Sequence, residues 1–401
     1  MRLLLTILTL PLAAIPALAQ TSGWQTDFDI GAREYVSENY DKAQEFLTTA
    51  LDKTKAEKQT EASEQNAALC LLWLAKVDFH KGALDQAEKR LQAALATFKK
   101  GEKNPLKNQN TIAALHNLAK VNWRLGRFKE AERNYLMALN LCKKGLGTNH
   151  PSTAEVMTSL GLLYDEMDED GKAAETLMEA IDIYTATVGP DHPMIAIPIN
   201  NLALLRQKQG RLEEAETLMK RTIALREIQY GPDSPRVAIA LNNLAMLNAS
   251  QNKLEEAEIL LKQSLSIREK SLGSDNVVVA ESLNNMAYVK KQKKEYTDAE
   301  DLYKQSLQIY TLNYGEEHPG TATLLNNLAA LYTVQNKLPE AESYYKRSIS
   351  IRKKVLSDTH HQVLESLNSL IPVCAAEGKN EEAALLQQEL QSLLIKRAAR
   401  E

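Results

Sequence analysis

A five-residue phrase returns at a constant interval along most of this chain. Leu-Asn-Asn-Leu-Ala begins at Leu241 and returns, with one change, at Leu283 and again unchanged at Leu325, a spacing of 42 residues each time. A second column, which holds alanine at every step from Ala131 to Ala383, keeps the same interval. A fixed period in this range is the signature of a repeat architecture, so the chain is not expected to fold around one globular core.

The repeat covers almost the whole chain. Two weaker copies, spaced by 44 residues, precede the regular ones, which gives nine copies in all. They start near residues 24, 68, 112, 154, 196, 238, 280, 322 and 364. We therefore expect one repeat domain over residues 20–401, with no room for a separate catalytic domain.

Each copy is predicted to form two helices. In the sixth copy Leu241, Leu244 and Ala245 are spaced i, i+3, i+4, which is a helical stripe. A polar turn at 251–253 follows, and then a second apolar stripe. This stripe ends before Gly273, and glycine is a residue that commonly ends a helix. A lone helix pair cannot bury its apolar face, so stacked neighbours must supply the core.

The copies resemble the tetratricopeptide repeat. The fourth copy carries its pattern as Met157-x2-Leu160-Gly161-x2-Tyr164, followed by Ala173 and Leu177. The usual period is about 34 residues, and the longer unit here is similar to the kinesin light chain subtype. That subtype's Asn-Asn-Leu-Ala phrase, its Glu-Ala-Glu and its Gly-x-x-His-Pro loop all occur in this sequence, the loop three times, starting at Gly147, Gly189 and Gly315.

The resemblance implies an all-α fold, a right-handed α-solenoid or superhelix of stacked antiparallel helix pairs. It implies little about function, because such repeats serve many partners. The chain shows no N-terminal heptad coiled coil and begins with a signal-like segment. We therefore do not identify it as a true kinesin light chain, and motor transport is not inferred.

The first nineteen residues are predicted to be a signal peptide. Arg2 is followed by an apolar run and by Ala17-Leu18-Ala19, a small-residue ending typical of a cleavage site. The run is short and interrupted by proline, which disfavours a membrane span. We expect an exported protein, periplasmic or extracellular, with no membrane insertion after cleavage. A formal charge of −4 disfavours nucleic acid as a partner.

Several residues that could suggest chemistry are better explained as structure. His150, His192, His318 and His360 occur once per repeat, so we expect turn residues and no shared metal ion. The run from Glu166 to Gly171 resembles the start of a calcium loop, but Leu177 stands where the bidentate glutamate is needed. Three cysteines cannot form a disulfide framework; buried free thiols are expected, with a Cys70–Cys142 bridge as the alternative. No enzyme motif is present, so we predict no catalytic activity, no cofactor and no metal.

The recurring asparagines need a specific reason, because asparagine is a mediocre helix former. They fall where the family presents its concave face, and an amide can bond a peptide backbone whatever its side chains are. The alternative is a ladder in which the asparagines bond one another between repeats, and each member of a pair could serve one role. The predicted groove residues of this kind are Asn117, Asn200, Asn201, Asn242, Asn243, Asn284, Asn285, Asn326 and Asn327.

The same face differs in the second and third copies, where aromatic and basic residues replace the asparagine pairs. Such a surface suits an aromatic or acidic peptide. Trp73 and Phe79 belong either to this face or to the core of a degenerate repeat. The predicted groove residues here are Lys76, His80, His116, Lys120, Trp123 and Arg124.

These features predict an exported, non-enzymatic scaffold that holds an extended peptide or a partner protein in its concave groove. A structural self-assembly module, and an accessory subunit of an envelope enzyme or secretion complex, are the alternatives. The ligand and the oligomeric state stay open at this point.

The mature N-terminus is expected to be Gln20, because the Ala17-Leu18-Ala19 tripeptide places the cut after Ala19. Intact-mass measurement of natively exported protein tests this. A mass that includes Met1 would contradict the prediction and favour an uncleaved anchor.

Overall fold

The computed structural model describes residues 23–100 and 109–398, and the predicted signal peptide lies outside them. Regular structure in the described residues is helical throughout, as the sequence predicts. None of the described helices is long and apolar enough to cross a membrane. The helices form two compact units that meet in sequence at Arg211 and Leu212, and each is described by itself.

Unit 1 holds the helices up to Arg211 and unit 2 holds those that follow. The helices of unit 1 are α1 (Gly23–Val36), α2 (Tyr40–Ala56), α3 (Glu61–His80), α4 (Leu84–Lys100), α5 (Gln109–Arg124), α6 (Phe128–Gly145), α7 (Pro151–Glu166), α8 (Asp170–Val188) and α9 (Ala196–Lys208), the last preceded by the 3₁₀ turn η2 (Pro193–Ile195). Those of unit 2 are α10 (Leu212–Tyr230), α11 (Pro235–Ser250), α12 (Leu254–Leu272), α13 (Val277–Gln292), α14 (Tyr296–Tyr314), α15 (Pro319–Val334), α16 (Leu338–Val355), α17 (His361–Ala376) and α18 (Asn380–Ala398).

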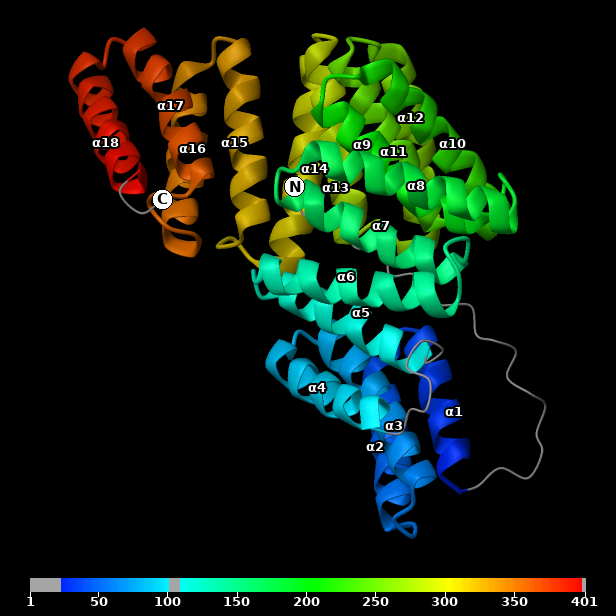
Figure 1. Ribbon diagram of the computed structural model, residues 1–401. Helices are drawn as coiled ribbons and strands as arrows, with labels where there is room; N and C mark the ends of the chain where they lie inside the picture. Colours follow the sequence, from blue (N-terminus) through cyan, green and yellow to red (C-terminus); the bar gives the residue numbers. More distant parts are fainter. Residues whose placement is uncertain (1–22, 101–108, 399–401) are drawn as a thin grey trace. The chain divides into compact units, whose positions relative to one another are not determined.

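Within each unit the helices stack pair upon pair (Figure 1). The odd-numbered helix of a repeat is its first helix and the even-numbered helix is its second. First helices of consecutive repeats, such as α3 and α5 or α11 and α13, contact each other more than second helices do. The first helices therefore line the inner side of each unit, and we call their side chains on that side the inner face. The predicted α-solenoid of stacked helix pairs is confirmed.

The starts of most first helices are set by a side-chain cap. The His-Pro dipeptide provides two parts of it: the imidazole of His150 accepts from the backbone N–H of Ser152, and Pro151 begins α7 where no N–H is needed. Ser234 and Asn276 accept the same bond at α11 and α13. At α3, a capping box between Thr60 and Ser63 starts the helix earlier than the repeat register near residue 68 suggested.

Small residues let the paired helices approach closely. Ala245 and Ala257 are fully buried between α11 and α12, and the hydroxyl of Ser264 donates to the carbonyl of Ala238 at 2.8 Å. Ser306 and Ser348 repeat this bond in the next two repeats, each at 2.7 Å. A larger side chain at these columns would push the helices apart, which is why the alanine column recurs at the repeat period.

The turn between the two helices of a repeat has one backbone geometry throughout. Its middle residue has a positive φ in every repeat, and the next N–H reaches back to the last turn of the first helix, as Glu295 does to the carbonyl of Lys290. Glycine holds this position at Gly82, Gly126, Gly210 and Gly378. Lys294, at φ 65, adopts the same conformation with a Cβ that crowds the backbone.

Replacing Lys294 by glycine should raise the stability of the protein by about 0.5–1 kcal/mol. Glycine removes a strain of about 1–2 kcal/mol but adds freedom to the unfolded chain. The midpoint of chemical unfolding measures the effect. Asn336→Gly, at φ 58, is the matched control and should gain less, because asparagine tolerates this conformation. A lower midpoint for Lys294→Gly would contradict the account.

Candidate functional site

All the residues predicted to line a groove lie on first helices. Those from Lys76 to Asn201 belong to α3, α5 and α9 of unit 1, and those from Asn242 to Asn327 belong to α11, α13 and α15 of unit 2. The structure thus brings them together as two inner faces, one in each unit, with different chemistry.

The inner face of unit 2 is an asparagine ladder. The amide of Asn285 donates to Oδ1 of Asn242 at 3.0 Å, and Asn327 donates to Oδ1 of Asn284 at 2.7 Å. Each bond joins the second asparagine of one repeat to the first asparagine of the repeat before it. Ser366 continues the series by donating to Oδ1 of Asn326 at 2.8 Å. Bonds between repeats, which the sequence offered as one of two roles, are therefore present.

The ladder uses the oxygens of the amides more fully than their N–H groups. Oδ1 of Asn242, Asn284 and Asn326 each accepts a bond, whereas the Nδ2 of Asn242 and of Asn326 donates to none of the described residues. Asn243 makes no side-chain hydrogen bond within the described part of the chain. All of these side chains are half-buried. Hydrogen bonds to Oδ1 hold the amides of Asn242, Asn284 and Asn326, while the N–H donors of Asn242 and Asn326 stay open.

In unit 1 a hydrogen bond between consecutive first helices occurs at the same repeat positions, but with different residues. Nε2 of His116 on α5 lies 2.8 Å from the hydroxyl of Ser159 on α7, which is the ladder bond with imidazole and serine in place of two amides. Nδ1 of the same ring lies 3.8 Å from Oε1 of Glu155. Ser159 is not among the groove residues predicted from the sequence, although its repeat position, one residue beyond the column of His116, carries the signal.

Two lysines, Lys76 and Lys120, act electrostatically on His116 and Glu155. Burial lowers the pKa of Lys76 to about 8, with Lys120 lowering it further and Glu155 opposing both. Burial also lowers the pKa of Lys120 and raises that of Glu155, while the two lysines pull the glutamate back. Burial, Lys120 and Lys76 hold the pKa of His116 well below its ordinary value, so the ring is neutral near pH 7.

Ser159, His116 and Glu155 are the residue types of a hydrolase triad, but their spacing and charge environment differ from those of a triad. A triad needs an imidazolium that forms during the reaction and is stabilised by a hydrogen-bonded carboxylate. Here the carboxylate is 3.8 Å from the ring nitrogen, and two nearby lysines oppose a positive charge on the ring. The arrangement is suited to holding repeats together and not to activating a nucleophile.

The aromatic residues of the first two repeats form one cluster. Trp73 meets Phe28 and Tyr35 edge-on, with ring centroids 5.8 and 5.5 Å apart. Its other side is covered by the ammonium of Lys76, 4.0 Å from a ring centroid. Trp73 therefore packs against the core and also reaches the basic residues. Phe79 is half-buried, with the guanidinium of Arg124 5.8 Å from its ring.

His80 is held by aromatic neighbours. Its Nε2 lies 3.1 Å from the hydroxyl of Tyr35, and its ring stacks on Tyr40 at a centroid distance of 4.7 Å. Burial, with Lys120 and Arg124 nearby, lowers the pKa of His80 to about 4. This predicted groove residue is consequently uncharged and locked in place.

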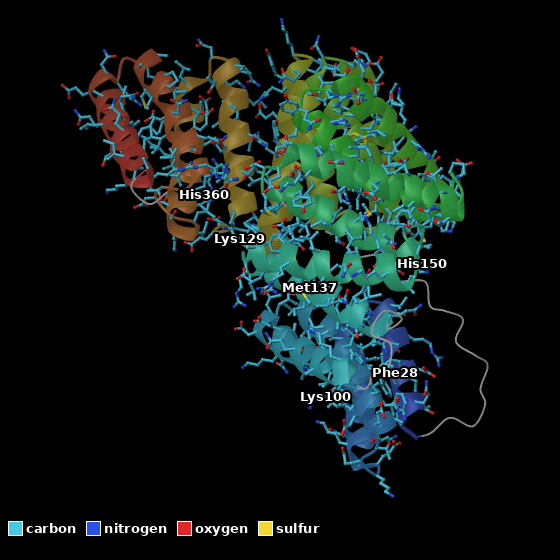
Figure 2. All side chains as sticks on the ribbon, viewed as in Figure 1. Phe28, Lys100, Lys129, Met137, His150 and His360 are labelled. Carbon is cyan, nitrogen blue, oxygen red and sulfur yellow. The ribbon has the colours of Figure 1, made fainter. Side chains whose placement is uncertain are left out.

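The loop histidines act as helix caps. His192, His318 and His360 each accept a backbone N–H two residues on, as His150 does, at distances between 3.0 and 3.3 Å. Figure 2 shows His150 and His360 each at the start of a helix of its own unit. The calcium-like turn in unit 1 is bridged by Lys208, whose ammonium lies 2.8 Å from Asp168 and 2.9 Å from Asp170.

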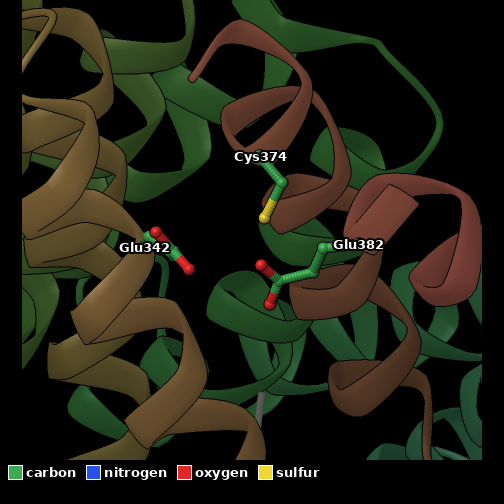
Figure 3. Close-up of side chains that lie close together, drawn as sticks. All are labelled: Glu342, Cys374 and Glu382. Carbon is green, nitrogen blue, oxygen red and sulfur yellow. The ribbon is translucent and has the colours of Figure 1, made fainter. Parts of the chain in front are cut away.

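One trio in unit 2 has metal-ligand residue types: Glu342, Cys374 and Glu382 (Figure 3). Its carboxylates are already paired, because Lys346 bridges Glu342 and Glu382 while Lys379 binds Glu342. Hydrogen bonds from these lysines lower the pKa of Glu342 to about 2. Burial and the two carboxylates raise the pKa of Cys374, whereas a metal needs the thiolate. The trio is an ion-pair network between repeats.

The three cysteines are free and buried. Burial raises the pKa of Cys70 and of Cys142 to about 12, which makes both thiols unreactive. The preferred expectation of buried free thiols agrees with the structure.

Comparison with protein families identifies the repeat. The model of the tetratricopeptide repeat family matches residues 110–186, 187–270, 278–354 and 325–395. Comparison with curated proteins gave no match.

Solved structures with a similar fold cover most of the chain. The apo form of RapI is similar with a TM-score of 0.68 at 12% identity, over 93% of this chain and 98% of that one. A Rap protein complexed with competence and sporulation factor has a TM-score of 0.55 at 13% identity, over 94% of this chain and 99% of that one. A Podospora anserina protein described as a kinesin light chain with nearly identical TPR-like repeats has a TM-score of 0.46 at 23% identity, over 52% of this chain and 98% of that one.

A double-mutant cycle on Asn242 and Asn285 should reveal their bond as a favourable coupling of about 0.5–1.5 kcal/mol. Alanine is the better helix former at both sites, and the cycle cancels that gain. Chemical unfolding of the two single variants and the double variant provides the measurement. Additive effects would show that the amides do not bond in solution.

Proposed function

Because the chain belongs to the tetratricopeptide repeat family, we propose that it is an exported, non-enzymatic scaffold that binds an extended segment of a peptide or partner protein along its inner face. The predicted tetratricopeptide repeats are confirmed by the family match. Such repeats generally support binding and not catalysis.

The observation that carries this proposal is the row of fixed amides on α11, α13 and α15. The ladder holds Asn242 and Asn326 through their Oδ1 atoms, while the N–H groups of the same two side chains have no acceptor among the described residues. An extended peptide presents backbone carbonyls that match such donors whatever its sequence is. Prior fixation of the amides lowers the entropy lost on binding.

The Rap structure supports a binding function, since a protein of similar fold is complexed with competence and sporulation factor. Export rests on the signal-like residues 1–19 and implies a periplasmic or extracellular partner. The aromatic and basic residues of α3 and α5 favour an aromatic or acidic one.

Asn242→Asp with Asn326→Asp is the variant that tests the proposal. Aspartate keeps the oxygens that accept from Asn285 and Ser366, but it replaces the free N–H donors with oxygens that repel peptide carbonyls. Residues 20–401 are incubated with a pool of random, end-blocked decapeptides, and the retained peptides are measured by mass spectrometry. We expect retention by the wild type and about tenfold less by the variant.

Gln263→Glu with Gln305→Glu is the matched control, because it makes the same chemical change at two exposed positions of α12 and α14. It should retain peptides as the wild type does. The proposal fails when the wild type retains no peptide, or when the two variants behave alike. Light scattering that shows a stable, concentration-independent oligomer with no peptide bound would favour self-assembly instead.

A further inference from the structure

The last helix of unit 2, α18, carries large apolar side chains that none of the described residues covers. Figure 1 shows α18 beside α17, and it packs there through buried residues that include Leu390 and Leu393. Leu385 and Ile395 lie outside this contact, with 65% and 71% of their surfaces exposed. The outer face of a terminal repeat is normally polar, since it has to be soluble. The exposure of these two side chains therefore needs a reason.

Leu385 and Ile395 belong to a stripe that runs along the whole of α18. Its members are spaced alternately four and three residues apart, which keeps them on one side of an α-helix. All of them are exposed. We call them the outward stripe: Glu381, Leu385, Gln388, Ser392 and Ile395. Four-and-three spacing is the spacing of helices that pair side by side along their length.

The other repeats of unit 2 keep charged or polar residues at two positions where α18 has none or has an apolar one. The position of Gln388 is lysine in all four preceding repeats, and the position of Ile395 is charged or polar in each. The residues at the first position are Lys220, Lys262, Lys304 and Lys346, and those at the second are Glu227, Glu269, Thr311 and Lys353. The last helix has therefore lost charge along the side on which a second helix could lie.

α18 also lacks the groups by which a second helix holds a following repeat. On α16, Glu342 binds a lysine of the next turn, and Arg352 donates to a backbone carbonyl at the start of the next first helix. The corresponding residues of α18 are Ala384 and Leu394. A further repeat stacked in the usual way would find neither the ion pair nor the hydrogen bond. The outward stripe fits instead another helix laid along it.

We propose that the outward stripe is a contact between two copies of this chain, in which the two α18 helices lie antiparallel about a twofold axis. Such a contact needs a surface that is complementary to itself. In this pairing Leu385 of each copy meets Ile395 of the other copy at both ends of the contact. In the middle, Gln388 of each copy meets Ser392 of the other, and the amide and hydroxyl can bond.

Charges at the two ends of α18 favour the antiparallel direction. Glu381 lies in its first turn and Lys396 near its end, and both are exposed. Antiparallel pairing brings Glu381 of one copy near Lys396 of the other, whereas parallel pairing would place like charges together. Glu389, beside the middle of the stripe, is already paired with Lys353 of α16, which reduces its repulsion of the same residue in the other copy.

The contact goes beyond the proposed function and is independent of it. One helix from each copy makes a small interface, so we expect an equilibrium that depends on concentration and not a permanent dimer. The outward stripe lies on a second helix, whereas the peptide is proposed to bind the inner faces of first helices. Each of the two activities can therefore be present or absent without the other.

Sedimentation velocity of residues 20–401 at increasing concentration tests the contact. We expect the wild type to pass from monomer to dimer by about 100 μM. Leu385→Gln with Ile395→Gln should raise the dissociation constant of the dimer about a hundredfold, because two apolar side chains of each copy lose their contacts. Both side chains are exposed in the monomer, so the variant should fold as the wild type does.

Ile259→Gln with Leu312→Gln is the matched control. It makes the same kind of change at two side chains of α12 and α14 that are 57% and 73% exposed. These positions lie outside α18, so the dissociation constant should stay at the wild-type value. Circular dichroism should give the same helical content for both variants.

Charge reversal and cross-linking test the direction and the symmetry of the pair. Glu381→Lys alone should weaken the dimer about tenfold, and Lys396→Glu added to the same chain should restore it. Gln391 lies beside the proposed axis, so Gln391→Cys should give a disulfide-linked dimer when diamide is the oxidant. The three native cysteines are buried. Gln263→Cys, at an exposed position of α12, is the control and should cross-link much less.

The contact is refuted if the wild type stays monomeric over this range, or if the α18 variant and its control dissociate alike. A monomer that sediments with phosphatidylcholine vesicles, and loses this binding in the α18 variant, would assign the stripe to a lipid surface. Species that grow beyond the dimer would replace the twofold pair with open head-to-tail stacking. Retention of peptides is measured separately, so none of these results decides the scaffold function.

Discussion

Packing between neighbouring repeats is the constraint on which the structure depends. A helix pair of this length leaves one apolar face uncovered, and only the next pair can bury it. The same interval therefore appears in every kind of contact: fully buried alanines, the hydroxyl of Ser264 on a carbonyl of the paired helix, and the asparagine bonds across the inner face. Ion pairs such as Lys253 with Glu216, at 2.6 Å, repeat it at the surface.

This constraint also shapes the binding face. Side chains that satisfy one another between repeats are fixed in orientation, and what they leave unsatisfied is what a ligand can use. In unit 2 the amide N–H donors of Asn242 and Asn326 have no acceptor among the described residues, and they are neutral. In unit 1 the inner face instead carries the ammonium groups of Lys76 and Lys120, whose pKa values burial lowers. One architecture thus offers two chemistries on equivalent helix positions.

Several features that invite a catalytic or metal-binding interpretation have structural explanations of the same kind. The histidines of the His-Pro loops satisfy backbone N–H groups at helix starts, a role that Ser234 and Asn276 fill in other repeats. Glu342, Cys374 and Glu382 come together because an ion-pair network joins consecutive repeats there. His116 contacts Ser159 because that pair occupies the ladder position between α5 and α7.

The sequence alone determined the fold class, the number of repeats and the helix faces, because a 42-residue period repeats the same local demands and leaves little else to decide. It also placed the groove candidates on first helices. It could not decide between the two roles of the asparagines, since a bond from Asn285 to Asn242 depends on how far one repeat is offset from the next. Nor could it show that Glu155 approaches His116. Those facts depend on distances between side chains that are more than thirty residues apart in sequence, and only the packing of the repeats sets such distances.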